Sequence, residues 1–136
     1  MSLTKLELWC QDAITILAGP DDIPRLIELR RETVRGFAHS PHLYEVAADI
    51  AEDLNDLVPD SQRVVREYLI ANYGFSFEFF IDKKLAEVRK VLARGRIGSE
   101  KDVRLLSDFA ADTSNDEILT AAADSLLEDY ARLMKR

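Results

Sequence analysis

The sequence predicts an all-α protein: a compact single-domain bundle of six or seven mostly antiparallel helices. Apolar residues recur at the three- and four-residue spacing of amphipathic helices along almost the whole chain. Short breaks of Gly, Pro, Ser or Asp separate these segments, and short connections favour antiparallel neighbours. The length of 136 residues, 47% of them hydrophobic, suits one helical domain over residues 1–136.

Residues that start and stop helices mark the first three segments. Thr4 and Glu7 have the spacing of a capping box, which satisfies free backbone N–H groups at a helix start. The pair Gly19-Pro20 ends this segment. Later in the chain, Ser40-Pro41 has the order of an N-cap followed by a first-turn proline. These signals predict helices over residues 3–18, 23–37 and 40–57.

Glycine and serine mark the remaining segments. Gly74 and Gly95 end two of them, and Ser99 begins another with Asp102 at capping-box spacing. Residues 75–79 alternate apolar and polar side chains, which is the period of a strand, but no other segment could pair with them. We therefore expect helices over residues 60–74 and 76–95, from 99 onward, and from Ser114 or Asn115 to the C-terminus.

Apolar stripes on these helices indicate which residues form the core. In segment 40–57 the stripe includes Ala47, Ile50 and Leu54. In the last segment it includes Leu126 and Leu133. Both segments are expected to be core helices.

Two basic residues, Arg30 and Lys84, fall inside stripes that are otherwise apolar. A buried charge is costly unless it is paired. One interpretation is a structural ion pair, for which Asp102 is a candidate acid, or a long side chain whose charged end reaches water. The alternative is a pocket for an anionic ligand, which Arg94 and Arg96 could extend.

Three apolar residues, Leu8, Ile70 and Phe79, fall on faces that are otherwise polar. Single exposed apolar residues are common on protein surfaces. The alternative interpretation is that these three residues form a hydrophobic interface, which would make the protein a homodimer.

Charge is divided into blocks along the chain, which has a net charge of −7. Residues 36–62 contain six acids and no Lys or Arg. Such a face can be ordinary solvated surface. It can also dock a basic protein partner, because attraction speeds encounter, or meet a basic face of a second copy. Five of these acids lie on one face of segment 40–57: Glu45, Asp49, Glu52, Asp53 and Asp56.

Motifs for catalysis, metals and cofactors are missing from the sequence. No Ser/His/Asp set or phosphate-binding loop is present. A metal site at His39 and His42 would need more ligands, such as Asp21, Asp22 or Glu45, and histidines in a loop near a helix start are usually ordinary surface residues. The single cysteine, Cys10, lies on an apolar face and predicts a buried thiol. We expect no catalytic residues, no metal and no cofactor.

Membrane and nucleic-acid binding are not expected either. No stretch has the length of an apolar membrane span. The last two predicted helices could be mistaken for a DNA-reading helix pair. The second of them would carry acids toward the DNA phosphates, which repel them. Without a visible export signal, a cytoplasmic protein is expected.

Together these observations predict a non-enzymatic protein–protein interaction or assembly module, whose partner is a protein, basic in one interpretation, or a second copy. The alternative is a binder of an anionic small molecule, which could be an enzyme, with Arg30 and Lys84 in a helical-bundle pocket.

Overall fold

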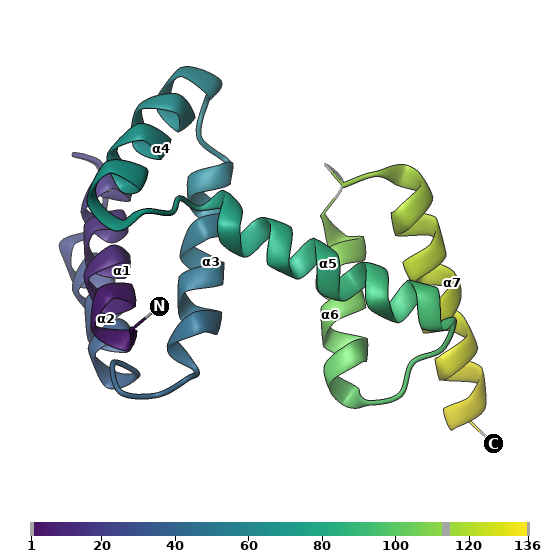
Figure 1. The fold of residues 1–136 in the computed structure, drawn as a ribbon. Coiled ribbons are helices and arrows are strands. Elements are labelled where there is room, and N and C mark those ends of the chain that lie inside the picture. Colours follow the sequence, from purple (N-terminus) through teal and green to yellow (C-terminus); the bar gives the residue numbers. More distant parts are fainter. Residues whose placement is uncertain (1, 113–114, 136) are drawn as a thin grey trace. The chain divides into compact units, whose positions relative to one another are not determined.

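A computed structural model describes residues 2–112 and 115–135, and these residues form seven helices and no strand (Figure 1). The prediction of an all-α bundle is confirmed. The chain divides into two compact units, residues 1–82 and 83–136, with the division inside the fifth helix. That residues 1–136 form one domain stays a prediction. The helices are α1 (Leu3–Leu17), α2 (Pro24–Gly36), α3 (Leu43–Asn55), α4 (Pro59–Tyr73), α5 (Glu78–Arg94), α6 (Glu100–Ala111) and α7 (Glu117–Met134).

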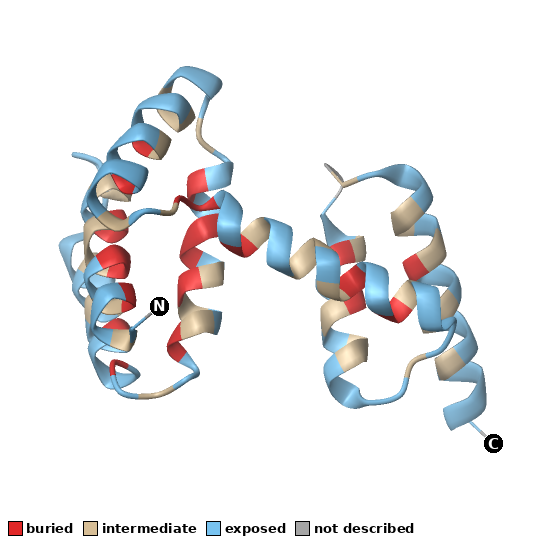
Figure 2. Ribbon diagram, in the orientation of Figure 1, coloured by how far each residue is buried: buried red, intermediate tan, exposed pale blue. Residues whose placement is uncertain are grey.

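In the first unit, α1 is the central helix and packs against α2, α3 and α4. The buried positions of α1 and α3 face each other (Figure 2). Trp9 of α1 is fully buried and stacks on Phe75, with ring centroids 5.6 Å apart. The Trp9 indole Nε1 donates a hydrogen bond of 3.3 Å to the carbonyl oxygen of Phe75. These contacts attach the segment after α4 to the core.

Residues 75–77 are a turn, and α5 begins at Glu78, so the expected helix start at residue 76 was two residues early. Gly74 ends α4 with a φ of 84°, the left-handed conformation that glycine adopts without strain. In the turn that follows, Phe77 enters the core and Phe75 stacks on Trp9. The strand-like alternation thus arises from a turn with two packed aromatic rings.

Two other helix starts differ from the sequence prediction. The cap of α1 is Ser2 and not Thr4, because the Ser2 hydroxyl accepts a hydrogen bond of 3.1 Å from the Lys5 backbone N–H. Residues 40–42 form a tight turn in which each backbone carbonyl oxygen accepts a hydrogen bond from the N–H group three residues later, so α3 begins at Leu43.

The starts of α4 and α7 also differ. Pro59 is the first residue of α4, one residue before the predicted start at residue 60, which fits the preference of proline for the first helical position. The cap of α7 is Asp116, whose carboxylate accepts from the backbone N–H groups of Ile118 and Leu119. The predicted start at Ser114 lies outside the described residues, and Asn115 precedes the observed cap.

The second unit contains most of α5 together with α6 and α7. Its core consists of a small cluster of buried residues: Val88, Val91, Leu106, Phe109 and Ala123. Ser99 caps α6 as predicted, since its hydroxyl accepts from the Asp102 backbone N–H at 3.3 Å. The pairing of α6 with α7 is the main helix contact in this unit.

Candidate functional site

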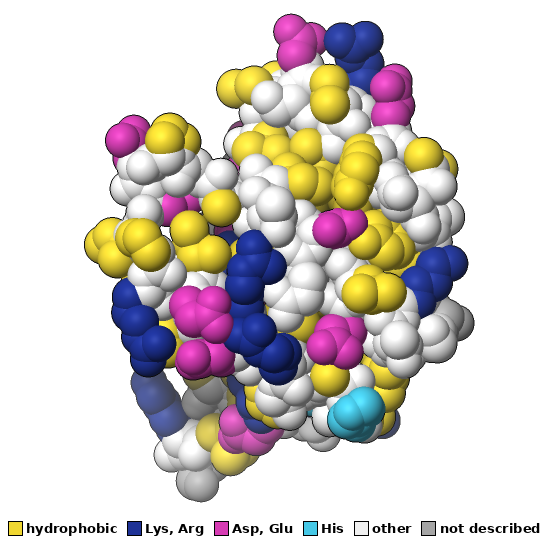
Figure 3. Space-filling model, turned by 90° about the vertical axis from the view of Figure 1, so that its left-hand side faces the viewer, with side chains coloured by type: hydrophobic (Ala, Val, Ile, Leu, Met, Phe, Trp, Pro, Cys, Tyr) yellow, Lys and Arg dark blue, Asp and Glu magenta, His cyan; other side chains and the backbone are white. Residues whose placement is uncertain are grey.

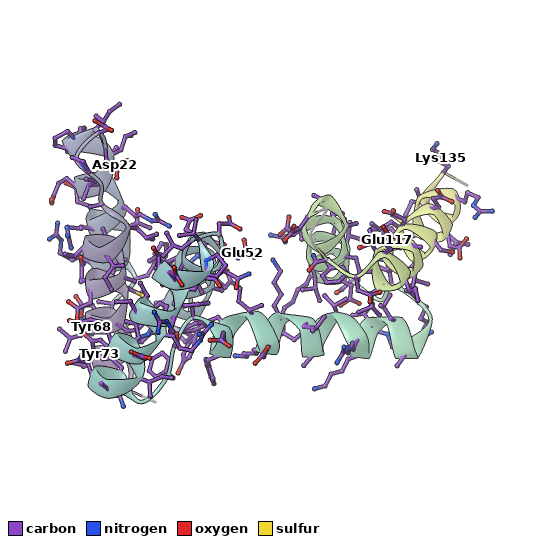
Figure 4. The ribbon with its side chains drawn as sticks, turned by 90° about the horizontal axis from the view of Figure 1, so that it is seen from above. Asp22, Glu52, Tyr68, Tyr73, Glu117 and Lys135 are labelled. Carbon is purple, nitrogen blue, oxygen red and sulfur yellow. The ribbon has the colours of Figure 1, made fainter. Side chains whose placement is uncertain are left out.

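The acidic residues of α3 all lie on its exposed side. The apolar residues of α3 repeat every three or four positions and face α1, so the acids between them point away from the core. Glu52, labelled in Figure 4, lies on the side of α3 away from α1. We call these five exposed residues the acidic face of α3: Glu45, Asp49, Glu52, Asp53 and Asp56.

Arg30 of α2 pairs with the acidic face at Asp53. The guanidinium Nη2 lies 2.5 Å from Oδ2 of Asp53, and both side chains are partly exposed. Arg30 therefore has the ion-pair partner that the first interpretation required, and this partner is Asp53 rather than Asp102. Sequence reasoning did not identify Asp53 as the partner, because the pair depends on how α2 packs against α3.

The other arginines of α2 also have partners within the first unit. Arg25 lies 3.7 Å from Glu32, and Arg35 lies 2.5 Å from Glu28. The Arg31 guanidinium donates hydrogen bonds to side-chain oxygens of α1, namely those of Gln11 and Thr15. The positive charge of α2 is thus largely engaged with its own neighbours.

A partly open groove of about 190 Å³ lies between the end of α1 and the start of α2. Two of its lining residues, Ile23 and Leu26, are each 60% exposed. The groove is mostly apolar, with one carboxylate and one guanidinium among its lining residues: Ile14, Leu17, Ala18, Asp22, Ile23, Leu26, Ile27 and Arg30. Sequence reasoning missed it because a groove depends on the packing of two helices.

The other basic candidates, Lys84, Arg94 and Arg96, belong to the second unit, whereas Arg30 belongs to the first. Lys84 is half-buried on α5. Arg94 pairs with Asp102 and donates a hydrogen bond of 3.2 Å to the carbonyl oxygen of Arg96. Asp102 also accepts from the Gly98 backbone N–H at 3.0 Å. This bond, with the Arg94 guanidinium, lowers the pKa of the Asp102 carboxyl below its ordinary value.

The three predicted surface apolar residues are all exposed: Leu8 by 56%, Ile70 by 49% and Phe79 by 42%. The Phe79 ring also packs edge-on against Phe80, with centroids 5.1 Å apart. Hydrophobic side chains gather on the face of the first unit shown in Figure 3, with acids and bases around them. The hydrophobic-interface interpretation stays a prediction.

A cluster that the sequence did not indicate joins α1 to α4. The hydroxyls of Tyr68 and Tyr73 both donate to the Asp12 carboxylate, the first at 3.0 Å. Figure 4 shows both tyrosines beside α1. Hydrogen bonding to Asp12 raises the pKa of the Tyr68 hydroxyl. Burial is the larger cause that raises the pKa of the Tyr73 hydroxyl, and its own hydrogen bond to Asp12 is the second. The cluster fixes α4 on α1, and a separation of more than 50 residues hid it from sequence patterns.

Cys10 is buried in the core, and His42 pairs with an acid of α3. Cys10 is fully buried, and burial raises the pKa of its thiol to about 12, so it is a core thiol as predicted. His42 lies 2.9 Å from Glu45, its neighbour one turn along. Within the described residues, no three His, Cys, Asp or Glu side chains are grouped as metal ligands would be. None of the described helices has the length and apolar content to cross a membrane.

In the first unit, the Arg30–Asp53 pair connects the acidic face of α3 to a residue that lines the apolar groove. Carboxylates accept hydrogen bonds from Lys and Arg, and an apolar groove holds an apolar side chain. Comparison with protein-family models, curated proteins and solved structures found no match to this chain.

Proposed function

We propose that this protein is a non-enzymatic protein–protein interaction module whose acidic face of α3 binds a basic protein partner. One observation supports the proposal most directly. All five acids of this face are exposed on one side of α3, within a stretch, residues 36–62, that contains no Lys or Arg.

Electrostatics gives such a face a clear role in binding. A single exposed ion pair contributes only about 0–1 kcal/mol, but a concentrated acidic surface raises the rate at which a basic partner is captured. The attraction extends about 10 Å at moderate salt and shortens as salt rises. Binding through the acidic face should therefore be fast and sensitive to salt.

The alternative, an anion binder built on Arg30 and Lys84, receives less support. Arg30 already pairs with Asp53, and Arg94 already pairs with Asp102. A bound anion would have to displace a carboxylate from each guanidinium, which costs the energy of an existing charge-assisted hydrogen bond.

The experiment measures binding of fluorescently labelled octalysine by anisotropy at low and high salt. The test variant combines Asp49→Asn, Glu52→Gln and Asp56→Asn, which leaves the Arg30–Asp53 and His42–Glu45 pairs in place. The matched control combines Asp108→Asn, Asp124→Asn and Glu128→Gln, three exposed acids of the second unit. Both variants change the net charge equally.

We expect the α3 variant to bind octalysine about tenfold more weakly, since three lost pairs of about 0.5 kcal/mol each sum to about one factor of ten. The control should bind as the unmodified protein does. Equal weakening of both variants would mean that only net charge matters. That result, or no octalysine binding at low salt, would contradict the proposal.

A further inference from the structure

We propose that the basic partner presents an amphipathic helix, with one apolar side chain in the groove between α1 and α2 and basic side chains against the acidic face of α3. This inference rests on the proposed function and specifies the chemistry of the partner. It is carried by the size of the groove, by the exposure of its apolar residues and by the charges beside it.

The volume of the groove suits a side chain rather than a whole ligand. Pockets for small molecules usually measure about 300–1,000 Å³. The groove is about 190 Å³ and partly open, so it would leave much of such a ligand in water. A single leucine or phenylalanine side chain is closer to this size, and interfaces are commonly anchored by one apolar side chain in a pocket of this kind.

Exposed apolar residues at the groove provide the attraction. Ile23 and Leu26 are each 60% exposed, and both line the groove. Covering apolar surface releases free energy in proportion to its area, at roughly 25 cal/mol per Å². An apolar side chain seated in the groove would cover both residues, whereas a purely charged partner would leave them in water.

Charge determines which partner fits. Asp22 lines the groove, and Arg30, which also lines it, is paired with Asp53 of the acidic face. The groove is therefore linked to the acidic face through Arg30 and Asp53, while Arg25 and Arg35 of α2 pair with Glu32 and Glu28. A partner that is apolar on one side and basic on the other matches both surfaces.

The groove also favours a helix over an extended partner strand. An extended peptide usually binds by adding to the edge of a sheet, and the described residues contain no strand. A groove between two helices is the usual receptor for an amphipathic helix, which presents apolar residues every three or four positions. The partner segment is therefore expected to be helical when bound.

The experiment compares three labelled probes by anisotropy. The first is a leucine–lysine peptide with helical apolar spacing, the second has the same composition in scrambled order, and the third is octalysine. The test variants are Leu26→Ser and, separately, Ile23→Ser, both at exposed positions. The matched control is Val64→Ser on α4, a residue that is 61% exposed and does not line the groove. Circular dichroism verifies that each variant keeps its helices.

We expect the amphipathic peptide to bind about tenfold more tightly than the scrambled one, and Leu26→Ser to remove most of this difference. Val64→Ser should leave it unchanged, and all three variants should bind octalysine equally. If Leu26→Ser fails to fold, Ile23→Ser provides the same comparison.

Each other outcome overturns the inference in a recognisable way. If octalysine binds but the amphipathic and scrambled peptides bind equally, the groove has no role and the proposed function stands. If Leu26→Ser and Val64→Ser weaken binding of the amphipathic peptide equally, the groove again has no role and the proposed function stands. If light scattering shows that Leu26→Ser converts a dimer to a monomer, the groove holds a second copy instead. If no probe binds, the proposed function fails as well.

Discussion

The Arg30 guanidinium on α2 lies 2.5 Å from the Asp53 carboxylate on α3, at the border between the apolar groove and the acidic face. Both side chains are partly exposed, so the pair contributes at most about 1 kcal/mol to stability. Its larger effect is on surface charge, because Arg30 neutralises one of the five acids of the acidic face.

Replacing Arg30 distinguishes the two functions considered for this protein. In Arg30→Gln, Asp53 loses its cation, and we expect octalysine to bind about two- to threefold more tightly, with stability lowered by no more than about 1 kcal/mol. Anisotropy titration and thermal unfolding measure the two effects. The control is Arg35→Gln, which has the same charge change but frees Glu28 on α2 itself. Weaker octalysine binding, or loss of inorganic phosphate binding by Arg30→Gln, would favour the anion-binding alternative.

Exposed apolar residues of the first unit predict a homodimer that survives high salt. Light scattering should give twice the mass of one chain at low and high salt, because hydrophobic contacts are not screened. Phe79→Lys or Ile70→Lys should then give a monomer, whereas Val58→Lys, at another exposed apolar residue, should not. A monomer at both salt concentrations would remove this interface. A dimer that dissociates in salt would indicate contact between acidic and basic faces.

The buried thiol of Cys10 should be unreactive in the folded protein. Burial raises its pKa from 9.0 to about 12, and only the thiolate attacks a disulfide reagent. At about pH 8 we expect reaction at least about 100-fold slower than in denaturant, which serves as the reference. Because the folded state favours the neutral thiol, the contribution of Cys10 to the stability of the fold is fully present below pH 9.0. This contribution is lost as the pH rises toward about 12. Rapid reaction of the folded protein would contradict the described burial.

Unfolding can test whether residues 1–136 form one domain. The only tryptophan, Trp9, reports on the first unit, whereas circular dichroism reports on the helices of both. One domain predicts coincident transitions. Val88→Ala, at a fully buried position of the second unit, should then shift both transitions by about 1–3 kcal/mol. A fluorescence transition that Val88→Ala leaves unchanged would show that the units unfold separately.

Local chemistry made most helices predictable from sequence. Gly74 ends α4 and Ser99 begins α6 as expected, because each effect involves only neighbouring backbone groups. The errors at Thr4 and at Ser40-Pro41 are also local. The Ser2 hydroxyl caps α1 at the Lys5 backbone N–H, and a turn of backbone hydrogen bonds at residues 40–42 precedes α3.

Burial was predictable only where a neighbouring helix runs alongside. The stripe of α3 is buried as expected, at Ala47, Ile50 and Leu54, because α1 covers it. The stripe of α7 is buried only in part, since Ala123 is fully buried, Leu126 is half-buried and Leu133 is exposed. α7 has 18 residues and its partner α6 has 12, so α6 is too short to cover all of α7.

The sequence by itself determined the helical class and the acidic face of α3, because periodicity and charge are properties of one segment. Only the tertiary structure decided that Arg30 meets Asp53, that Asp12 receives both tyrosines, and that α1 and α2 form a groove. Arg30 and Asp53 are 23 positions apart, and Asp12 is 56 and 61 positions from the two tyrosines, on different helices in each case. Their meeting depends on the angle and register of helix packing, which no single segment encodes.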